Sequence, residues 1–214
     1  DKIDSPSDIK SLSIDELKLL SDEVASYIHS TVSQIGGHYS SPLGVVELTI
    51  ALLKIYDSPN DKIIWDVGHQ AYAHKILTGR RKEFQTLRQK NGISGFLKID
   101  ENEHDIFGAG HASTSISAAL GFAHSRDHNK DNNQVIAIIG DGGMTGGLAY
   151  EGINNLGYHK TQLTVVLNDN SLSISKSVGA LSKYLTLITT NSAYNRFRKD
   201  VWKYSGKIPF LSNL

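Results

Sequence analysis

The sequence predicts an α/β protein with three layers, helices on both faces of a mostly parallel central sheet. Two apolar, β-branched runs, residues 135–139 and 163–167, suggest the fold. Between them, residues 145–156 are long enough for a crossover helix. A strand, a helix and a strand in that order form a right-handed βαβ unit with parallel strands. A strand that is apolar throughout is typical of the middle of such a sheet, so residues 135–139 are expected to be central.

The N-terminal part is expected to begin with a long helix. Ser13 and Glu16 have the spacing of a capping box, in which each side chain binds the other residue's backbone N–H. Apolar residues then recur at helical spacing as far as Val32. Gly36 and Gly37 follow and should end the helix.

Further elements follow in order. A second helical stretch is expected after Pro42, with apolar residues on one face as far as Ile55. Residues 62–66 form a short apolar run between turn residues, which indicates a buried strand. Residues 113–120 are rich in small side chains and predict a helix. Beyond about residue 185 the pattern is less regular, so we expect domain 1–184 to be followed by a mobile or helical tail, 185–214.

Composition excludes several classes of protein. The 214 residues carry 22 Lys and Arg against 22 Asp and Glu, so charge gives no reason to expect nucleic acid or an anionic membrane as partner. The absence of cysteine excludes disulfides, thiolate metal sites and a thiol nucleophile. No apolar run approaches the roughly 18 residues of a membrane span, and the polar start does not resemble a signal peptide. We therefore expect a cytoplasmic protein.

The most informative motif is the glycine-rich loop after the central strand, Gly140, Asp141, Gly142 and Gly143. Such a loop, between a parallel strand and a helix, presents backbone N–H groups and a helix N-terminus at the carboxyl edge of the sheet, where phosphates bind. The glycines could also serve only to make a tight turn. A third interpretation is a dinucleotide site that uses Gly146 as a further glycine.

Asp141 argues against a simple dinucleotide loop. Two like charges about 4 Å apart repel by about 4 kcal/mol at an effective dielectric constant near 20. A divalent cation between them reverses the sign, and Mg²⁺ takes oxygen ligands from protein, phosphate and water. The next strand ends at residues 168–170, Asn-Asp-Asn, whose amide oxygens suit such a cation. The loop is therefore interpreted as a diphosphate site that works through a metal.

This pair of motifs resembles the metal–diphosphate motif of thiamine-diphosphate enzymes. Other segments narrow the resemblance to the 1-deoxy-D-xylulose-5-phosphate synthase family and favour it over transketolases. They are residues 36–38, 66–72, 75–81, 110–117, 168–175 and 178–181, so the resemblance covers nearly the whole chain. It implies thiamine diphosphate and Mg²⁺ as cofactors.

The resemblance assigns the metal ligands. Asp141 and Asn170 would bind Mg²⁺ through their side chains, and Leu172 through its backbone carbonyl. The backbone N–H groups of Gly142 and Gly143 would hold the diphosphate. Asn170 thereby also contributes to the cofactor site.

The resemblance also assigns cofactor contacts and two catalytic histidines. Gly110, His111 and Ala112 match a cofactor-contacting segment. His38 and His69 look like acid–base and orienting groups beside the reacting carbon, with His69 also touching the cofactor, because imidazole titrates near neutral pH.

The remaining basic side chains are given no place in the site. His74 is expected to be structural, whereas His104 and four other histidines fall on polar stretches and are expected at the surface. Arg80 and Arg81 leave two interpretations open, a phosphate-binding patch or a solvated helix face.

The resemblance implies condensation of pyruvate, after decarboxylation, with D-glyceraldehyde 3-phosphate to 1-deoxy-D-xylulose 5-phosphate and CO₂. Family members have three domains and form homodimers, and only the first domain matches here. The glutamate that activates the cofactor belongs to the pyrimidine-binding domain, so we expect a fragment that is inactive without the remaining domains. The alternatives are the N-terminal subunit of a split transketolase and an NAD(P)-binding Rossmann module that uses residues 140–146 and Asp169.

Overall fold

The computed structural model describes residues 3–169 and residue 196. Residues 3–169 belong to one compact unit, Asp1–Ser173. The expected domain boundary at residue 184 lies outside the described residues. The elements in chain order are α1 (Pro6–Ile9), α2 (Ile14–Ile35), α3 (Ser40–Leu43), α4 (Val46–Ile55), β1 (Lys62–Trp65), α5 (Tyr72–Lys75), the π-turn η1 (Ile76–Arg80), the 3₁₀ turns η2 (Glu83–Thr86) and η3 (Gly143–Thr145), α6 (Ser115–Asn129), β2 (Val135–Gly140), α7 (Gly147–His159) and β3 (Thr164–Asn168).

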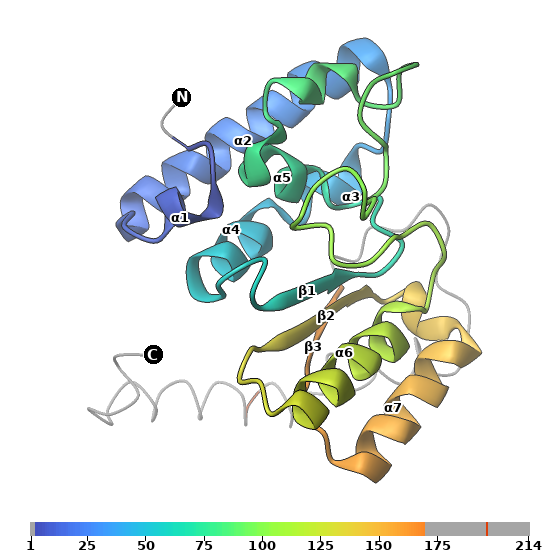
Figure 1. Cartoon of the computed structure of the whole chain (residues 1–214). Helices are drawn as coiled ribbons and strands as arrows, with labels where there is room; N and C mark the ends of the chain where they lie inside the picture. Colours follow the sequence, from blue (N-terminus) through green and yellow to red (C-terminus); the bar gives the residue numbers. More distant parts are fainter. Residues whose placement is uncertain (1–2, 170–195, 197–214) are drawn as a thin grey trace. The chain divides into compact units, whose positions relative to one another are not determined.

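The strands of the described residues form a parallel sheet in the order β1-β2-β3 (Figure 1). Lys62 is in register with Val135, and Gly140 with Asn168. The two strands predicted from apolar runs on either side of the crossover helix are thus neighbours, and β2 is central as expected. The crossover helix itself is α7, which begins at Gly147 and is preceded by η3.

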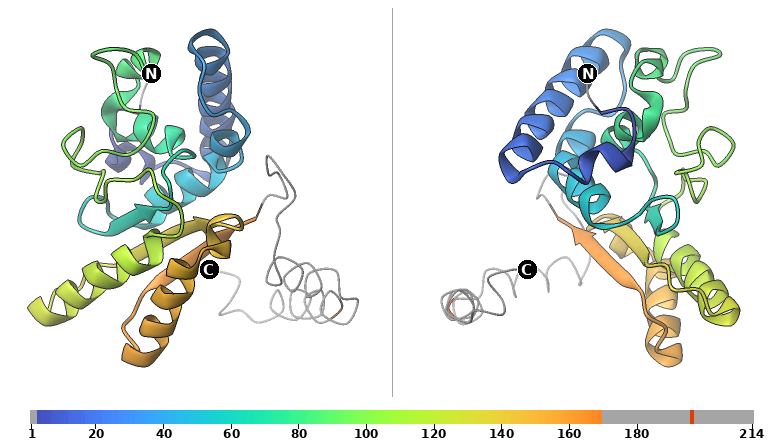
Figure 2. Two further views of the ribbon diagram at one scale, coloured as in Figure 1. Left: turned by 90° about the vertical axis from the view of Figure 1, so that its right-hand side faces the viewer. Right: turned by 60° about the vertical axis from the view of Figure 1, so that its left-hand side comes forward.

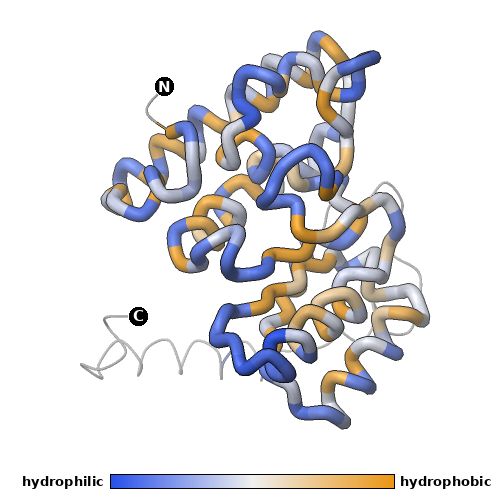
Figure 3. Tube along the Cα trace, viewed as in Figure 1, coloured by the Kyte–Doolittle hydropathy of each residue, from blue (hydrophilic) through white to orange (hydrophobic). Residues whose placement is uncertain are grey.

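Alternate residues of the strands enter two separate hydrophobic cores. Ile63, Trp65 and Ile138 face the core formed with α2, α4 and α5. Ile64 and Ala137 face the opposite core, formed with α6 and α7. Figures 1 and 2 show these two groups of helices on opposite faces of the sheet, and Figure 3 shows apolar residues along the strands between them. The predicted three-layer α/β/α architecture is therefore confirmed.

The predicted ends of the first helix are confirmed in detail. Ser13 is the N-cap of α2, and its backbone N–H donates to Glu16 Oε2 at 2.8 Å, which completes the capping box. Gly36 ends the helix with φ 78°, a conformation that favours glycine. The next helical stretch differs from its prediction, since it consists of α3, which already begins at Ser40, and α4. Pro42 is tolerated in a first turn because the N–H it lacks would have no helical acceptor there.

The carboxyl ends of the three strands meet at one edge of the sheet. The backbone N–H of Asp66 donates to Ile138 O at 2.8 Å, and that of Asp141 donates to Asn168 O at 3.3 Å. This edge therefore carries the glycine-rich loop, the end of β3 and the segment that leads to His69. Within the described residues, no helix combines the length and apolar character needed to cross a bilayer.

Candidate active site

A buried carboxylate joins two of the loops at this edge. Asp66, which follows β1, is 1% exposed. Its Oδ2 accepts the backbone N–H of Ser113 at 2.9 Å, and its Oδ1 accepts that of Ser115 at 3.0 Å. Asp66 therefore binds the N–H of Ser115, the first backbone donor of α6, where a carboxylate is also favoured by the helix dipole. It fixes the segment 110–112 immediately before that helix.

The glycine-rich loop is pressed against the same carboxylate. The hydroxyl of Ser113 donates to Gly143 O at 2.6 Å. A Cβ built on Gly143 would lie 2.5 Å from Asp66 Oδ2, so a side chain there would displace the loop. Glycine at residue 143 thus permits the loop after β2 to approach Asp66 and the start of α6.

The opposite side of these loops is open. Gly110, His111, Ala112 and Gly142 are all exposed. A Cβ built on Gly110 or Gly142 meets no atom within 4 Å. The segments expected to contact the cofactor therefore border open space at the N-terminus of α7, where backbone N–H groups favour an anion.

The two predicted catalytic histidines lie together beside this edge. The rings of His38 and His69 have centroids 5.3 Å apart, edge to face. The centroid of the His38 ring also lies 5.7 Å from that of Phe96 and 6.3 Å from that of Tyr72. Gly68 packs against residues 97 and 109, which ties the His69 turn to the segment that leads into Gly110.

Both histidines are held in the neutral form. Partial burial lowers the pKa of His38, and the nearby Arg88 charge lowers it further. Burial also lowers the pKa of His69; His38 adds to this effect, and Asp66 opposes it. Near pH 7 each imidazole therefore offers one N–H donor and one nitrogen acceptor.

Within the described residues, each histidine has at least one ring nitrogen with no hydrogen-bond partner. Nδ1 of His69 is buried and accepts or donates no hydrogen bond within the described residues. The hydrogen bonds of His38 in that part of the chain run only from its backbone N–H and Nδ1 to Tyr72, which leaves Nε2 without a partner there. Because buried polar atoms are normally paired, the pair is suited to a ligand that supplies hydrogen-bonding atoms.

Of the three expected metal ligands, only Asp141 lies within the described residues, and its surroundings suit the role. Asp141 places a carboxylate directly after β2, beside Gly142, which borders open space, as a hydrated cation with phosphate ligands requires. Among the described residues, no three His, Asp or Glu side chains form a metal-binding group. A site with one carboxylate does not need such a group. The other expected ligands, Asn170 and Leu172, lie outside the described residues.

Neither interpretation of Arg80 is correct. Its side chain is 6% exposed, and its guanidinium binds both carboxylate oxygens of Asp105 at 2.7 and 2.8 Å, and Glu101 at 2.8 Å. Lys75 is fully buried and also contacts Glu101. Arg80 therefore belongs to an internal ion-pair cluster. The same carboxylates hold the segment 94–105, because Lys98 N donates to Asp105 and Ser94 N donates to Glu101.

The same cluster corrects one histidine and explains another. His104 is 9% exposed, and its Nδ1 pairs with Ser58 Oγ at 2.8 Å, so the expected surface position was wrong. His74 is buried beside Asp105, with Nε2 3.5 Å from Oδ1, which agrees with the structural role predicted for it.

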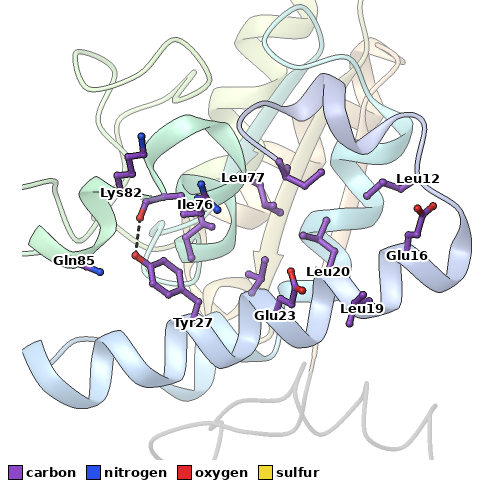
Figure 4. Close-up of a pocket in the computed structure, with 13 residues that line it drawn as sticks. Leu12, Glu16, Leu19, Leu20, Glu23, Tyr27, Ile76, Leu77, Lys82 and Gln85 are labelled. Atoms are coloured by element: carbon purple, nitrogen blue, oxygen red, sulfur yellow. Dashed lines mark hydrogen bonds between the residues drawn. The ribbon is translucent and has the colours of Figure 1, made fainter. Parts of the chain in front are cut away.

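A large cavity lies elsewhere. It measures about 810 Å³ and lies between α2 and the η1–η2 region (Figure 4). None of the predicted site residues lines it. Tyr27 borders it and donates its hydroxyl hydrogen to Arg81 O at 2.8 Å. The candidate site therefore lies at the sheet edge, apart from this cavity.

Solved structures identify the class of fold. Transketolase from Leishmania mexicana superimposes with a TM-score of 0.62 over 78% of this chain and 31% of the transketolase chain, at 19% sequence identity. At this level of identity the likeness shows a shared fold, the transketolase-like α/β/α layer in which the loops described here follow parallel strands.

Sequence comparison identifies the family. A model of the 1-deoxy-D-xylulose-5-phosphate synthase family matches residues 1–212. The chain is 56% identical over 206 residues to 1-deoxy-D-xylulose-5-phosphate synthase 2 of Geobacter sulfurreducens and covers 33% of it. It is 54% identical over 213 residues to the synthase of Halothermothrix orenii and covers 34% of that protein. The chain belongs to the 1-deoxy-D-xylulose-5-phosphate synthase family and spans about a third of the length of these relatives. The family predicted from the motifs is confirmed.

The structure adds residues to which the sequence analysis gave no role. Asp66 stands within a motif used for the resemblance, and its position at a strand end next to glycine was the available signal. Tyr72 belongs to the same motif. Phe96 lies in an irregular segment, and nothing in the local sequence connects it with His38.

Proposed function

We propose that this chain forms the diphosphate- and metal-binding part of a thiamine-diphosphate-dependent synthase. The whole enzyme would join pyruvate, with loss of CO₂, to D-glyceraldehyde 3-phosphate and form 1-deoxy-D-xylulose 5-phosphate. The observation that carries the proposal is the convergence of the loops after β1 and β2 with residues 110–115 on the buried carboxylate of Asp66. This convergence leaves an open, glycine-lined face beside two neutral histidines.

The chain's own residues would divide the work. Asp141, with Asn170 and the Leu172 carbonyl, would hold Mg²⁺, and the N–H groups of Gly142 and Gly143 would bind the diphosphate. Residues 110–112 would line the cofactor. Bound thiamine diphosphate supplies the carbanion chemistry of decarboxylation and carbon–carbon bond formation.

His38 and His69 would handle protons. Because both are neutral near pH 7, each can donate a hydrogen bond to an oxygen of the substrate or accept a proton from it. Phe96 and Tyr72 surround His38 and limit the positions that its ring can take. The histidines are therefore suited to orienting the substrate oxygen atoms and shuttling protons.

The remaining parts of the proposal concern the whole protein. We propose that the chain acts together with a pyrimidine-binding and a C-terminal domain, in a cytoplasmic homodimer, since it matches only a third of the relatives' length. A division into residues 1–184 and a tail, 185–214, that leads toward those domains belongs to the same proposal.

Calorimetric titration of thiamine diphosphate, with Mg²⁺ and then with EDTA, tests the site. Binding should require Mg²⁺ and should be lost in Asp141→Ala. Binding of NAD(P) without a metal, unaffected by that substitution, would refute the proposal. The split-transketolase alternative predicts instead a stable complex with a separate polypeptide, which co-purification would detect; a synthase fragment should form none.

A further inference from the structure

Within the described residues, both hydrogen bonds of His38 are made with Tyr72. Tyr72 begins α5 and is 0% exposed. The backbone N–H of His38 donates to its hydroxyl oxygen at 3.2 Å, and His38 Nδ1 lies 3.4 Å from the same oxygen. The two residues are 34 positions apart, so the fold brings them together.

The approach depends on a glycine. Gly37 has φ 147°, and a Cβ built on it would lie 3.0 Å from the Tyr72 hydroxyl oxygen. A larger residue would push the tyrosine away from the backbone N–H that follows. The double glycine after α2 therefore does more than end a helix, because it also lets the phenol reach the main chain of His38.

The hydrogen atoms can be placed by elimination. A backbone N–H can only donate, so the Tyr72 oxygen must accept it. The hydroxyl hydrogen then needs an acceptor, and within the described residues only His38 Nδ1 is in reach. If Nδ1 carried a proton instead, the buried hydroxyl hydrogen would be left unpaired, at a cost of about 1–3 kcal/mol.

We propose that Tyr72 is a positioning residue that fixes neutral His38 as the tautomer with its hydrogen on Nε2. Tyr72 donates to Nδ1, so the opposite edge of the ring presents an N–H donor. That Nε2 atom has no partner within the described residues, and His69 stands beside the ring. The ligand it would take is an oxygen acceptor, such as a substrate carbonyl or alkoxide oxygen. The inference rests on the proposed function only for the identity of that ligand.

The tautomer has a consequence for the acid–base behaviour of His38. A proton added to Nδ1 must displace the Tyr72 hydrogen bond, so Tyr72 stabilises the neutral ring. The other charge that acts on His38 is that of Arg88, whereas His38 and Asp66 both act on the neighbouring His69. All of them remain in place when only the hydroxyl of Tyr72 is removed.

The test is ¹³C and ¹⁵N NMR of the intact protein labelled at histidine, with the His38 signals assigned from His38→Gln. The ring-carbon shifts should report the Nε2–H tautomer in the parent. In Tyr72→Phe the ring should become a mixture of tautomers, and its pKa should rise by roughly half a unit to one unit. The ring of residue 72 keeps its packing on Phe84, whose centroid lies 5.5 Å away.

Tyr27→Phe is the matched control. Tyr27 also packs on Phe84, at 5.7 Å, but its hydroxyl binds Arg81 O, so the His38 signals should not move. An Nδ1–H tautomer in the parent would overturn the proposal, and so would unchanged His38 signals in a folded Tyr72→Phe protein. If Tyr72→Phe does not fold, the parent tautomer alone decides. None of these measurements requires thiamine diphosphate, so they stand or fall independently of the cofactor-binding experiment.

Discussion

The carboxylate of Asp66 binds the backbone N–H of Ser113 at 2.9 Å, across 47 residues of sequence. Asp66 directly follows β1, and Ser113 lies two residues before α6. Since Ser113 in turn binds Gly143 O, this contact connects three loops that come from distant parts of the chain. The shape of the candidate site therefore depends on one buried side chain that is expected to touch neither metal nor diphosphate.

Asp66→Asn should separate this supporting role from folding in general. Asparagine keeps the size but loses the charge and one of the two acceptor oxygens, so we expect a loss of about 1.5–3 kcal/mol in the free energy of unfolding. Cofactor binding should weaken as well, because residues 110–112 lose their anchor. Urea denaturation and calorimetry measure the two effects.

Asp15→Asn is a control at an exposed position, where the side chain is 94% exposed and pairs with Lys18 of the same helix. It should change neither quantity. Equal effects of the two substitutions would contradict the role assigned to Asp66.

Local patterns were sufficient to predict the layers of the fold. The β-branched run 135–139 and the capping pair Ser13 and Glu16 specify their elements through nearby residues alone, and both are found as predicted. The parallel direction of β2 and β3 also followed, because a strand, a crossover helix and a strand in the same sheet form a parallel unit. Within the site, the resemblance implied that His38 and His69 serve the same reacting carbon, and their rings do lie next to each other.

Long-range electrostatics could not be predicted in the same way. Arg80 lies in a basic stretch, which suggested exposure, but its partner Asp105 is 25 residues away in an irregular segment. His104 was misplaced for the same reason, since polar neighbours in sequence do not reveal a buried contact with Ser58. The hydrogen bonds of Asp66 and Tyr72 likewise depend on which loops the fold brings together.

Arg80→Met should destabilise the protein strongly. It removes the partner of two acidic groups, of which Asp105 is completely buried. Burial by itself would raise the pKa of Asp105, but hydrogen bonds from His74 and Arg80 hold it well below its usual range. Loss of one partner from a buried ion pair costs about 3–5 kcal/mol, which thermal and urea unfolding will detect.

Lys98→Met is the comparison from the same segment. Lys98 Nζ pairs with Asp100 at the surface, 58% and 72% exposed, and the bond of its backbone to Asp105 is unaffected. No measurable change in stability is expected. A comparable loss in both variants would mean that the ion-pair cluster has no special importance.

The glycines of the loop should respond differently to alanine. At residue 143 the new Cβ meets Asp66 Oδ2 at 2.5 Å and Ile139 Cγ1 at 2.9 Å, so Gly143→Ala should cost about 1–3 kcal/mol of stability. At residue 142 the Cβ meets nothing within 4 Å, and φ is −62°, so the fold should accept it. The methyl group would then stand on the face proposed for the diphosphate, and Gly142→Ala should weaken cofactor binding in a stable protein. Normal binding by Gly142→Ala would place the diphosphate elsewhere.

Stability should rise as the pH increases from 5 to about 6.5 and should then level off. Burial is the largest cause that lowers the pKa of His38, His69, His74 and His104 below the ordinary value of 6.5. Below pH 6.5 the unfolded chain therefore binds more protons than the folded one, which makes the slope of stability against pH positive. Each such histidine adds up to about 1.4 kcal/mol per pH unit to the slope of the unfolding free energy, the maximum being reached where the unfolded chain binds one full proton more than the folded one.

Urea midpoints measured at intervals between pH 5 and 8 give this slope, and they lie above the range in which the carboxylates titrate. His74→Gln removes a histidine that is 1% exposed. The slope should then fall by the equivalent of up to one proton taken up on unfolding, whatever the effect of the substitution on stability at pH 8. A parent protein equally stable at pH 5 and pH 7 would show that these imidazoles are not held neutral by burial. The neutral state assigned to His38 and His69 in the site would then be wrong as well.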